Sequence, residues 1–141
     1  ENNAAYSHIT WKQLNEMTES GLVEIQNHTY NMHEIGERRG SAMKQNETVT
    51  QYRKILTDDL IRLQKEIKHY TGKAPDTFTY PFGICSDHEE DIVKELGFKA
   101  TLSCSEGINY ITFSDRECLY QLKRYLRDKD STSSTMFEKF K

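Results

Sequence analysis

LVEIQNHTYNMH, residues Leu22 to His33, is the stretch on which the fold of this chain depends. It begins as a short apolar strand and runs directly into two histidines, His28 and His33. On an α-helix, a spacing of five residues would point these side chains about 140° apart, so they can share an ion only where the chain leaves regular structure. A strand that ends at Asn27 and opens into a turn meets this condition, because α/β folds bind ligands and metals at the C-terminal ends of strands. The alternative is two solvated loop histidines, and the spacing alone does not decide between them.

Three helices are predicted from their first turns, where a Ser or Thr is followed three residues later by Gln or Glu. These capping boxes are Thr10 with Gln13, Thr48 with Gln51, and Ser86 with Glu89. The helices are predicted to end at Gly21, Gly72 and Gly97. The second helix has one apolar stripe at spacings of three and four, which we interpret as core packing: Tyr52, Ile55, Leu56, Leu60, Leu63, Ile67 and Tyr70.

Apolar segments between these helices are predicted strands. They span residues 22–25, 77–80, 98–104 and 119–125, with residues 105–116 as one further irregular strand. Residues 34–47 have two glycines and no periodicity, so we expect a long loop that extends from the site toward solvent. A terminal helix is expected from Ser131, with Met136, Phe137 and Phe140 turned inward.

Alternating strands and helices predict an α/β fold of parallel β/α units with right-handed crossovers. All strands of a parallel sheet end on one face, so we expect His28, His33, the Pro81–Gly83 turn and Arg124 to converge there. A closed barrel of seven or eight units usually needs more than about 200 residues. The 141 residues are therefore expected to form a single domain, either a small open sheet or a partial, incomplete (β/α) barrel.

Composition excludes several classes of partner and site. The net charge is −3 with basic and acidic residues interleaved, so we expect no nucleic-acid or anionic-membrane partner. Three widely spaced cysteines form no CxxC pair, which argues against a zinc knuckle or a disulfide framework. Neither an apolar run of about 18 residues nor a leader-like start is present, so we expect no membrane segment or address in this chain.

Three sequence features together resemble one known family. They are His28-Thr29 followed by His33, the pentapeptide TYPFG at Thr79 to Gly83, and GFKATLSCSEGINYI from Gly97. The chain resembles the polysaccharide deacetylases, also called the NodB-homology or carbohydrate esterase 4 family, over about Thr10 to Lys141. The resemblance implies a (β/α) barrel domain that removes acetyl groups from glycans with the help of a divalent metal, commonly zinc.

Residue roles follow from this resemblance position by position. His28 and His33 are the expected metal ligands, and the backbone N–H of Phe82 is the expected donor to the oxyanion. Thr29 and residues 80–83 (Tyr80, Pro81, Phe82 and Gly83) are expected at the substrate groove, with Thr29 as a turn hydrogen-bonder rather than a catalyst. Arg124 is expected to contact either the substrate or the groups that support the metal ligands.

The chain departs from the family pattern at several positions. Thr79 stands where the family often has arginine, which puts the orientation of a catalytic carboxylate in question. No T-F-D-D motif is present to supply a general base and a third metal ligand, and no histidine follows His88 to act as general acid. We therefore expect the C-terminal part of a catalytic domain, with an incomplete metal site and little activity on its own.

Three functions remain compatible with the sequence. The first is metal-dependent N-deacetylation of an N-acetylglucosamine-containing glycan, such as peptidoglycan or poly-N-acetylglucosamine, at the bacterial cell surface or outside the cell. The second is a glycan-binding pseudoenzyme, and the third is an O-acetyl esterase acting on xylan-like polymers. An incomplete barrel has unpaired strand edges, so we also expect the chain to form a homodimer.

Overall fold

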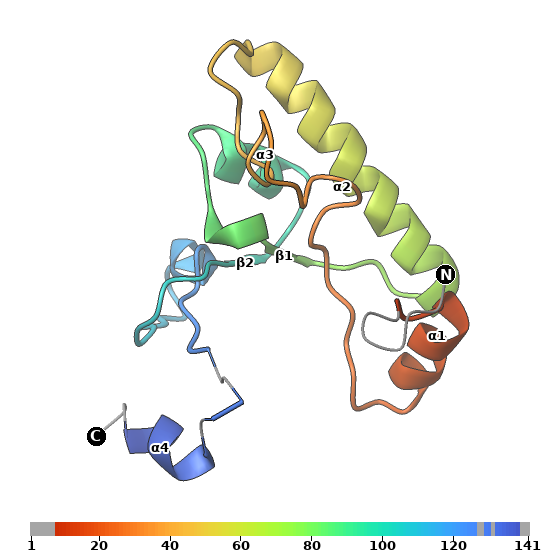
Figure 1. Cartoon of the computed structure of the whole chain (residues 1–141), viewed down its shortest axis with the longest axis vertical. Coiled ribbons are helices and arrows are strands. Elements are labelled where there is room, and N and C mark those ends of the chain that lie inside the picture. The colour runs from red at the N-terminus through yellow and green to blue at the C-terminus, as the bar shows by residue number, and fades with distance from the viewer. Residues whose placement is uncertain (1–7, 127–128, 131, 139–141) are drawn as a thin grey trace.

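Two short parallel strands, β1 (Thr77–Thr79) and β2 (Ala100–Leu102), lie at the centre of the structure (Figure 1). The computed structural model describes residues 8–126, 129–130 and 132–138. Asn27 forms a parallel bridge with β1, and Leu122 forms a parallel bridge with β2. Four segments thus run side by side in the same direction, in the order 27, β1, β2, 122. The predicted α/β class with parallel pairing is confirmed.

Helices surround this sheet unevenly. They are α1 (Trp11–Glu19), α2 (Val49–Thr71), α3 (Glu89–Glu95) and α4 (Ser133–Glu138), with the 3-10 turns η1 (Pro81–Gly83) and η2 (Arg116–Leu119). The long helix α2 contacts both α1 and α3, while α4 lies away from the sheet (Figure 1). In the described part of the chain, no helix has the length and apolar content needed to cross a membrane.

Two of the three predicted capping boxes are confirmed in full, at Thr10 before α1 and at Thr48 before α2. The third is half formed. The Ser86 N–H donates to Glu89 Oε2 at 3.0 Å, but the Glu89 N–H donates to the Ser86 carbonyl oxygen, not to its hydroxyl. The helix α3 consequently begins at Glu89, after a residue with φ 67°, His88.

The core lies between α2, α3 and the sheet. Its buried members are Met32, Tyr52, Leu56, Leu60, Phe78, Tyr80, Ile92, Val93 and Phe98. Two residues of the predicted stripe lie at its margin, because Ile55 and Tyr70 are 45% and 40% exposed. The Tyr70 ring stacks on Trp11 at 4.3 Å, which fastens α1 to the end of α2.

The predicted buried strand at residues 22–25 is wrong. Leu22 is 90% exposed, and the pairing of this segment with β1 is confined to Asn27. The side chain of Gln26 explains why. Its Oε1 accepts the N–H groups of Asp76 and Thr77, at 3.0 and 2.9 Å, so a side chain takes donors that a longer backbone ladder would use.

The C-terminal third also differs from the prediction. The strand expected at 98–104 is shortened to β2, and the one expected at 119–125 makes a single bridge at Leu122. Residues 105–116 form no strand, because the 119–125 segment takes the place beside β2. In α4, Phe137 is 59% exposed rather than inward, and the side chains of Met136 and Phe140 lie outside the described part.

The loop of residues 34–47 extends into solvent only in part, since Ile35 is 75% exposed but the middle of the loop is covered. Gly40 and Ser41 are buried, and the Arg38 guanidinium pairs with Glu47 Oε1 at 2.5 Å, where both side chains are largely covered. The loop therefore folds back on the body of the molecule. We call residues 34–47 the back loop.

Candidate active site

The chain turns just after Asn27, the residue that bridges to β1 and directly precedes the first candidate histidine. The buried Asn27 side chain donates to the Leu60 carbonyl at 3.1 Å and accepts the Thr29 N–H at 3.0 Å. Thr29 takes φ 71°, and its hydroxyl accepts the Met32 N–H at 3.2 Å. A tight turn results, which meets the geometric condition for two histidines five residues apart to face one another.

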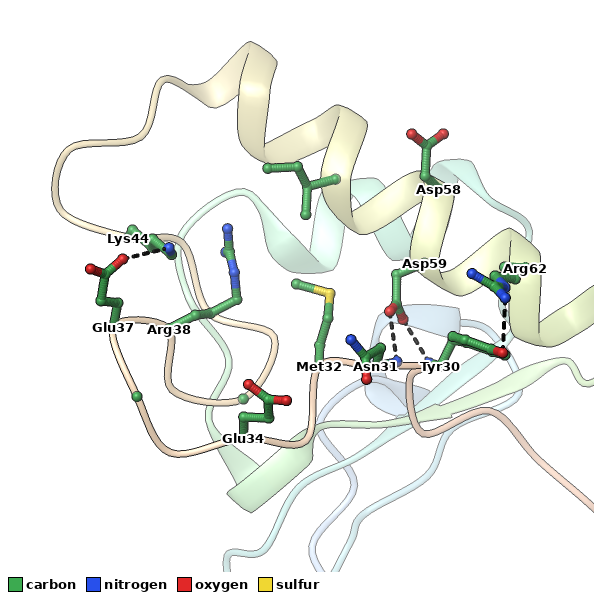
Figure 2. Close-up of a pocket in the computed structure, with 13 residues that line it drawn as sticks. Tyr30, Asn31, Met32, Glu34, Glu37, Arg38, Lys44, Asp58, Asp59 and Arg62 are labelled. Carbon is green, nitrogen blue, oxygen red and sulfur yellow. Dashed lines mark hydrogen bonds and ion pairs between the residues drawn. The ribbon is translucent and has the colours of Figure 1, made fainter.

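An acidic residue of α2 holds this turn from outside. The Asp59 carboxylate accepts the backbone N–H groups of Tyr30 and Asn31, at 2.7 and 2.8 Å, as Figure 2 shows. Charge-assisted bonds of this kind are about twice as strong as neutral ones. The segment between the two histidines is thereby tied to the longest helix of the molecule.

The two histidines lie together at the end of the sheet. The His28 and His33 ring centroids are 4.9 Å apart, and the His33 ring lies 4.4 Å from the Phe82 ring. Residues from two distant parts of the sequence thus meet where their strands end. The predicted convergence of the histidines with the Pro81–Gly83 turn is confirmed.

His28 is held in one orientation and one tautomer. Its Nδ1 lies 2.7 Å from the Thr79 carbonyl oxygen, which can only accept, so Nδ1 carries the proton and Nε2 keeps its lone pair. Burial lowers the pKa of His28, and the nearby His33 and Arg124 add to this, while the bond to Thr79 opposes it. The neutral imidazole, oriented by a carbonyl, is the form that binds metal ions.

The Pro81–Gly83 turn places Phe82 in an unusual conformation. Phe82 has φ 58° and ψ 11°, and no acceptor for its N–H is found among the described residues. Of the predicted groove residues, Tyr80 and Pro81 are buried, whereas Phe82 and Gly83 keep some accessible surface. Gly83 lies against the next strand end, since a Cβ there would be 2.5 Å from the Cys104 Cβ.

Arg124 closes the other side of this strand-end face. Its Nε donates to the Ser103 carbonyl at 2.7 Å, and its Nη2 lies 3.1 Å from Cys104 Sγ. Its charge is near enough to His28 to affect the imidazole. Arg124 thus lies near His28 at the strand ends, as the parallel topology predicts.

The described residues provide two metal ligands rather than a full set. His28 fits the role through its free Nε2, and His33 lies beside it. No group of three or more His, Cys, Asp or Glu suited to a metal occurs in the part of the chain that the structure describes. A catalytic zinc site usually has three protein ligands, so a third would have to come from elsewhere.

A separate pocket of about 570 Å³ lies between the back loop and α2 (Figure 2). Its walls include neither histidine nor Phe82. Most of its charged groups are already paired, Glu37 with Lys44, and Asp58 with Lys54. We therefore place the candidate active site at the histidines and not in this pocket.

Comparison with known proteins agrees with this geometry. The family described as "Polysaccharide deacetylase" matches residues 1–101. The chain belongs to the polysaccharide deacetylase family. Among its relatives are two proteins described as poly-beta-1,6-N-acetyl-D-glucosamine N-deacetylase, from Staphylococcus aureus strains MRSA252 and COL. They are 29% identical over 70% of this chain and 26% identical over 88% of it.

Solved structures of deacetylases share its fold. A de-N-acetylase from Aggregatibacter actinomycetemcomitans matches 94% of this chain with a TM-score of 0.77 and 28% identity. The BpsB deacetylase domain from Bordetella bronchiseptica matches 82% with a TM-score of 0.70 and 27% identity. The chain spans 32% and 45% of the two staphylococcal relatives and about half of these two structures. The fold is thus a partial α/β fold of the NodB type.

Three residues that shape the site were not singled out from the sequence. Asn27 and Asp59 form the turn, and Gly40 packs against Pro81. An Asn at the end of an apolar segment was a usable signal, because it interrupts the pattern next to a histidine. Asp59 and Gly40 gave none, since each looks like an ordinary surface or loop residue.

Proposed function

We propose that this chain is part of a metal-dependent polysaccharide N-deacetylase acting on N-acetylglucosamine-containing glycans. The observation that carries this proposal is the cluster of His28, His33 and Phe82 at the strand ends. The family membership and the names of the relatives agree with it. Because such glycans are surface polymers, we place the activity at the cell surface or outside the cell.

The reaction adds water to the amide carbonyl and breaks the C–N bond, which yields acetate and a free amine. His28 and His33 would hold the metal, for which we propose zinc. A bound zinc ion acts as a Lewis acid toward water and the acetyl oxygen. The described residues leave the third ligand and the catalytic carboxylates to be supplied from elsewhere.

The residues of this chain have distinct tasks in that reaction. His28 is kept neutral and is aimed by the Thr79 carbonyl. The Phe82 N–H, unpaired within the described residues, would donate to the oxyanion that forms at the acetyl carbon. Arg124, fixed by the Ser103 carbonyl, places a positive charge near His28 that helps to keep this imidazole neutral.

Zinc titration calorimetry tests the metal site. We expect this chain to bind zinc weakly, because two imidazoles are fewer ligands than a complete site has. His28→Ala or His33→Ala should weaken binding by about tenfold or more, the range seen when metal-site groups are lost. The matched control is His69→Ala, an exposed histidine on α2. Tight binding that survives both substitutions would place the metal elsewhere.

Acetate release completes the same test. The full-length protein that contains this chain should release acetate from poly-N-acetylglucosamine oligomers, and should do so faster than from acetylxylan. His28→Ala should abolish this release, and the isolated chain should show little of it. Preference for acetylxylan would instead support an O-acetyl esterase, and glycan binding without any acetate release would support a pseudoenzyme.

A further inference from the structure

The back loop has a defined structure that its own hydrogen bonds and an ion pair hold together. The Gly40 N–H donates to the Glu34 carbonyl at 2.9 Å, and Ile35 pairs with Arg39 in an antiparallel bridge. The Arg38 guanidinium donates to the Ala42 carbonyl at 2.6 Å and also pairs with Glu47. These bonds close residues 34–40 into a small ring and fix the chain that follows it.

Two side chains anchor the back loop directly after Gly40, one from α2 and one from the segment before α3. The buried Tyr52 hydroxyl of α2 donates to the Ser41 carbonyl at 2.9 Å. The Met43 N–H donates to Ser86 Oγ, ahead of α3, at 3.0 Å. Because Tyr52 belongs to the buried core and Met43 is also held, the backbone at residue 40 has little freedom to move away from Pro81.

Gly40 packs directly on the turn that carries the proposed oxyanion donor. It has φ 60° and is buried, and a Cβ there would lie 2.9 Å from the Pro81 carbonyl oxygen. The same Cβ would be 3.1 Å from Pro81 Cβ and 3.3 Å from Phe82 Cδ2. Only glycine meets both the backbone conformation and the close approach.

Phe82 needs such support. A non-glycine residue in the left-handed region costs about 1–3 kcal/mol and persists only when its surroundings hold it. Phe82 is at φ 58°, with its ring against His33 on one side and near Gly40 on the other. The direction of its N–H depends on that conformation.

We propose that Gly40 is a positioning residue: the back loop, anchored to α2 and to Ser86, holds Gly40 against Pro81 and thereby fixes where the Phe82 N–H points. The inference rests on the proposed function, because it gives Gly40 a role in the same reaction. Gly40 acts through its packing on Pro81, and the hydrogen bonds at Ser41 and Met43 hold it there.

Three glycine substitutions separate this role from general damage. Gly40→Ala introduces both left-handed strain and the clash with Pro81. Gly72→Ala introduces left-handed strain alone, since Gly72 has φ 76° and no atom within 4 Å of an added Cβ. Gly36→Ala adds a Cβ in the back loop with no contact within 4 Å and no positive φ.

Kinetics of the full-length protein are one readout. We expect Gly40→Ala to lower kcat by about tenfold or more while KM stays within about twofold, because outright loss of one oxyanion donor costs about 10² to 10³ in kcat. Zinc affinity should stay within about threefold. Gly36→Ala and Gly72→Ala should keep the wild-type kcat. An unchanged kcat in Gly40→Ala, or an equal loss in Gly72→Ala, would overturn the proposal.

The amide NMR signal of Phe82 is a second readout that does not need activity. Gly40→Ala should shift this signal and speed its hydrogen exchange, and the two control variants should not. If Gly40→Ala does not fold, Tyr52→Phe removes the anchor at Ser41 and should shift the same signal. If the wild-type protein releases no acetate, the proposed function fails, and an unchanged Phe82 signal in the folded variant then refutes the positioning role separately.

Discussion

Glu89, the first residue of α3, has a fully buried carboxyl group near Ser41 of the back loop and Tyr52 of α2. Its Oε2 accepts the Ser86 N–H and hydroxyl, while its Oε1 and the nearby Ser41 hydroxyl have no partner among the described residues. Burial raises the pKa of Glu89, and the surrounding hydrogen-bonding groups only partly offset this. The proton on Glu89 therefore affects the stability of the back loop's attachment.

At the residue scale, the raised pKa of Glu89 predicts that the unfolding free energy depends on pH. A raised folded-state pKa means that the folded chain keeps the proton after the unfolded chain has lost it. The stabilising contribution of Glu89 is thus full below the ordinary value of 4.5 and is lost as pH rises through the folded-state pKa. Glu89→Gln removes that loss, and its amide can donate to the Ser41 hydroxyl.

Urea denaturation at about pH 5 and pH 7.5 measures the effect. Relative to wild type, Glu89→Gln should lose less unfolding free energy between the two pH values. The control is Glu34→Gln, because Glu34 is an exposed residue in the back loop. An equal change in unfolding free energy between the two pH values for wild type and Glu89→Gln would show that the pKa of Glu89 is the same in the folded and unfolded states.

At the scale of elements, α2 supports the histidine turn through Asp59. Asp59→Ala removes the acceptor for the Tyr30 and Asn31 N–H groups and should loosen the segment between His28 and His33. We expect zinc affinity to fall by about 10- to 100-fold, as for other groups that orient metal ligands. The adjacent Asp58, which is largely exposed and pairs only with Lys54, gives the control Asp58→Ala. Calorimetry in which both variants bind zinc alike would contradict this role.

The elements that were predictable from the sequence are those with local causes. Thr10 and Thr48 form capping boxes within four residues of chain, so α1 and α2 were visible in the sequence. The strand prediction at residues 22–25 was wrong because the Gln26 side chain accepts the backbone N–H groups at the start of β1. The periodicity of the sequence does not reveal such a bond. The prediction for the back loop was wrong for a similar reason, since the loop contacts Tyr52 and Pro81, which are distant from it in the sequence.

The sequence predicted the residues of the candidate site but not the residues that hold them in place. The histidines and the Pro81–Gly83 turn follow from strand ends in a parallel sheet, a rule that needs only the order of elements. Asp59 and Gly40 act through backbone bonds and close packing. Neither leaves a pattern in the residue types around it.

At the scale of the whole molecule, we propose that the chain forms a homodimer. The segment at 22–27 pairs with β1 only at Asn27, and Leu22 is 90% exposed beside that open edge. Exposed edges and apolar side chains favour pairing with a second chain. Light scattering at rising concentration should give the mass of a dimer, and Leu22→Lys should lower it. The control is Ile35→Lys, at an exposed position in the back loop. A monomer mass at the highest concentration would exclude the dimer.

The helix α2 sets the spacing between the two halves of the candidate site. Tyr52 holds the back loop behind Phe82, and Asp59 holds the turn between the histidines. Seven residues separate them, which is nearly two full turns, so both point the same way along about 10 Å of rigid helix. Inserting one residue between them would rotate one support by about 100° away from the other. The length of this short piece of helix is therefore constrained separately from the identity of the residues within it.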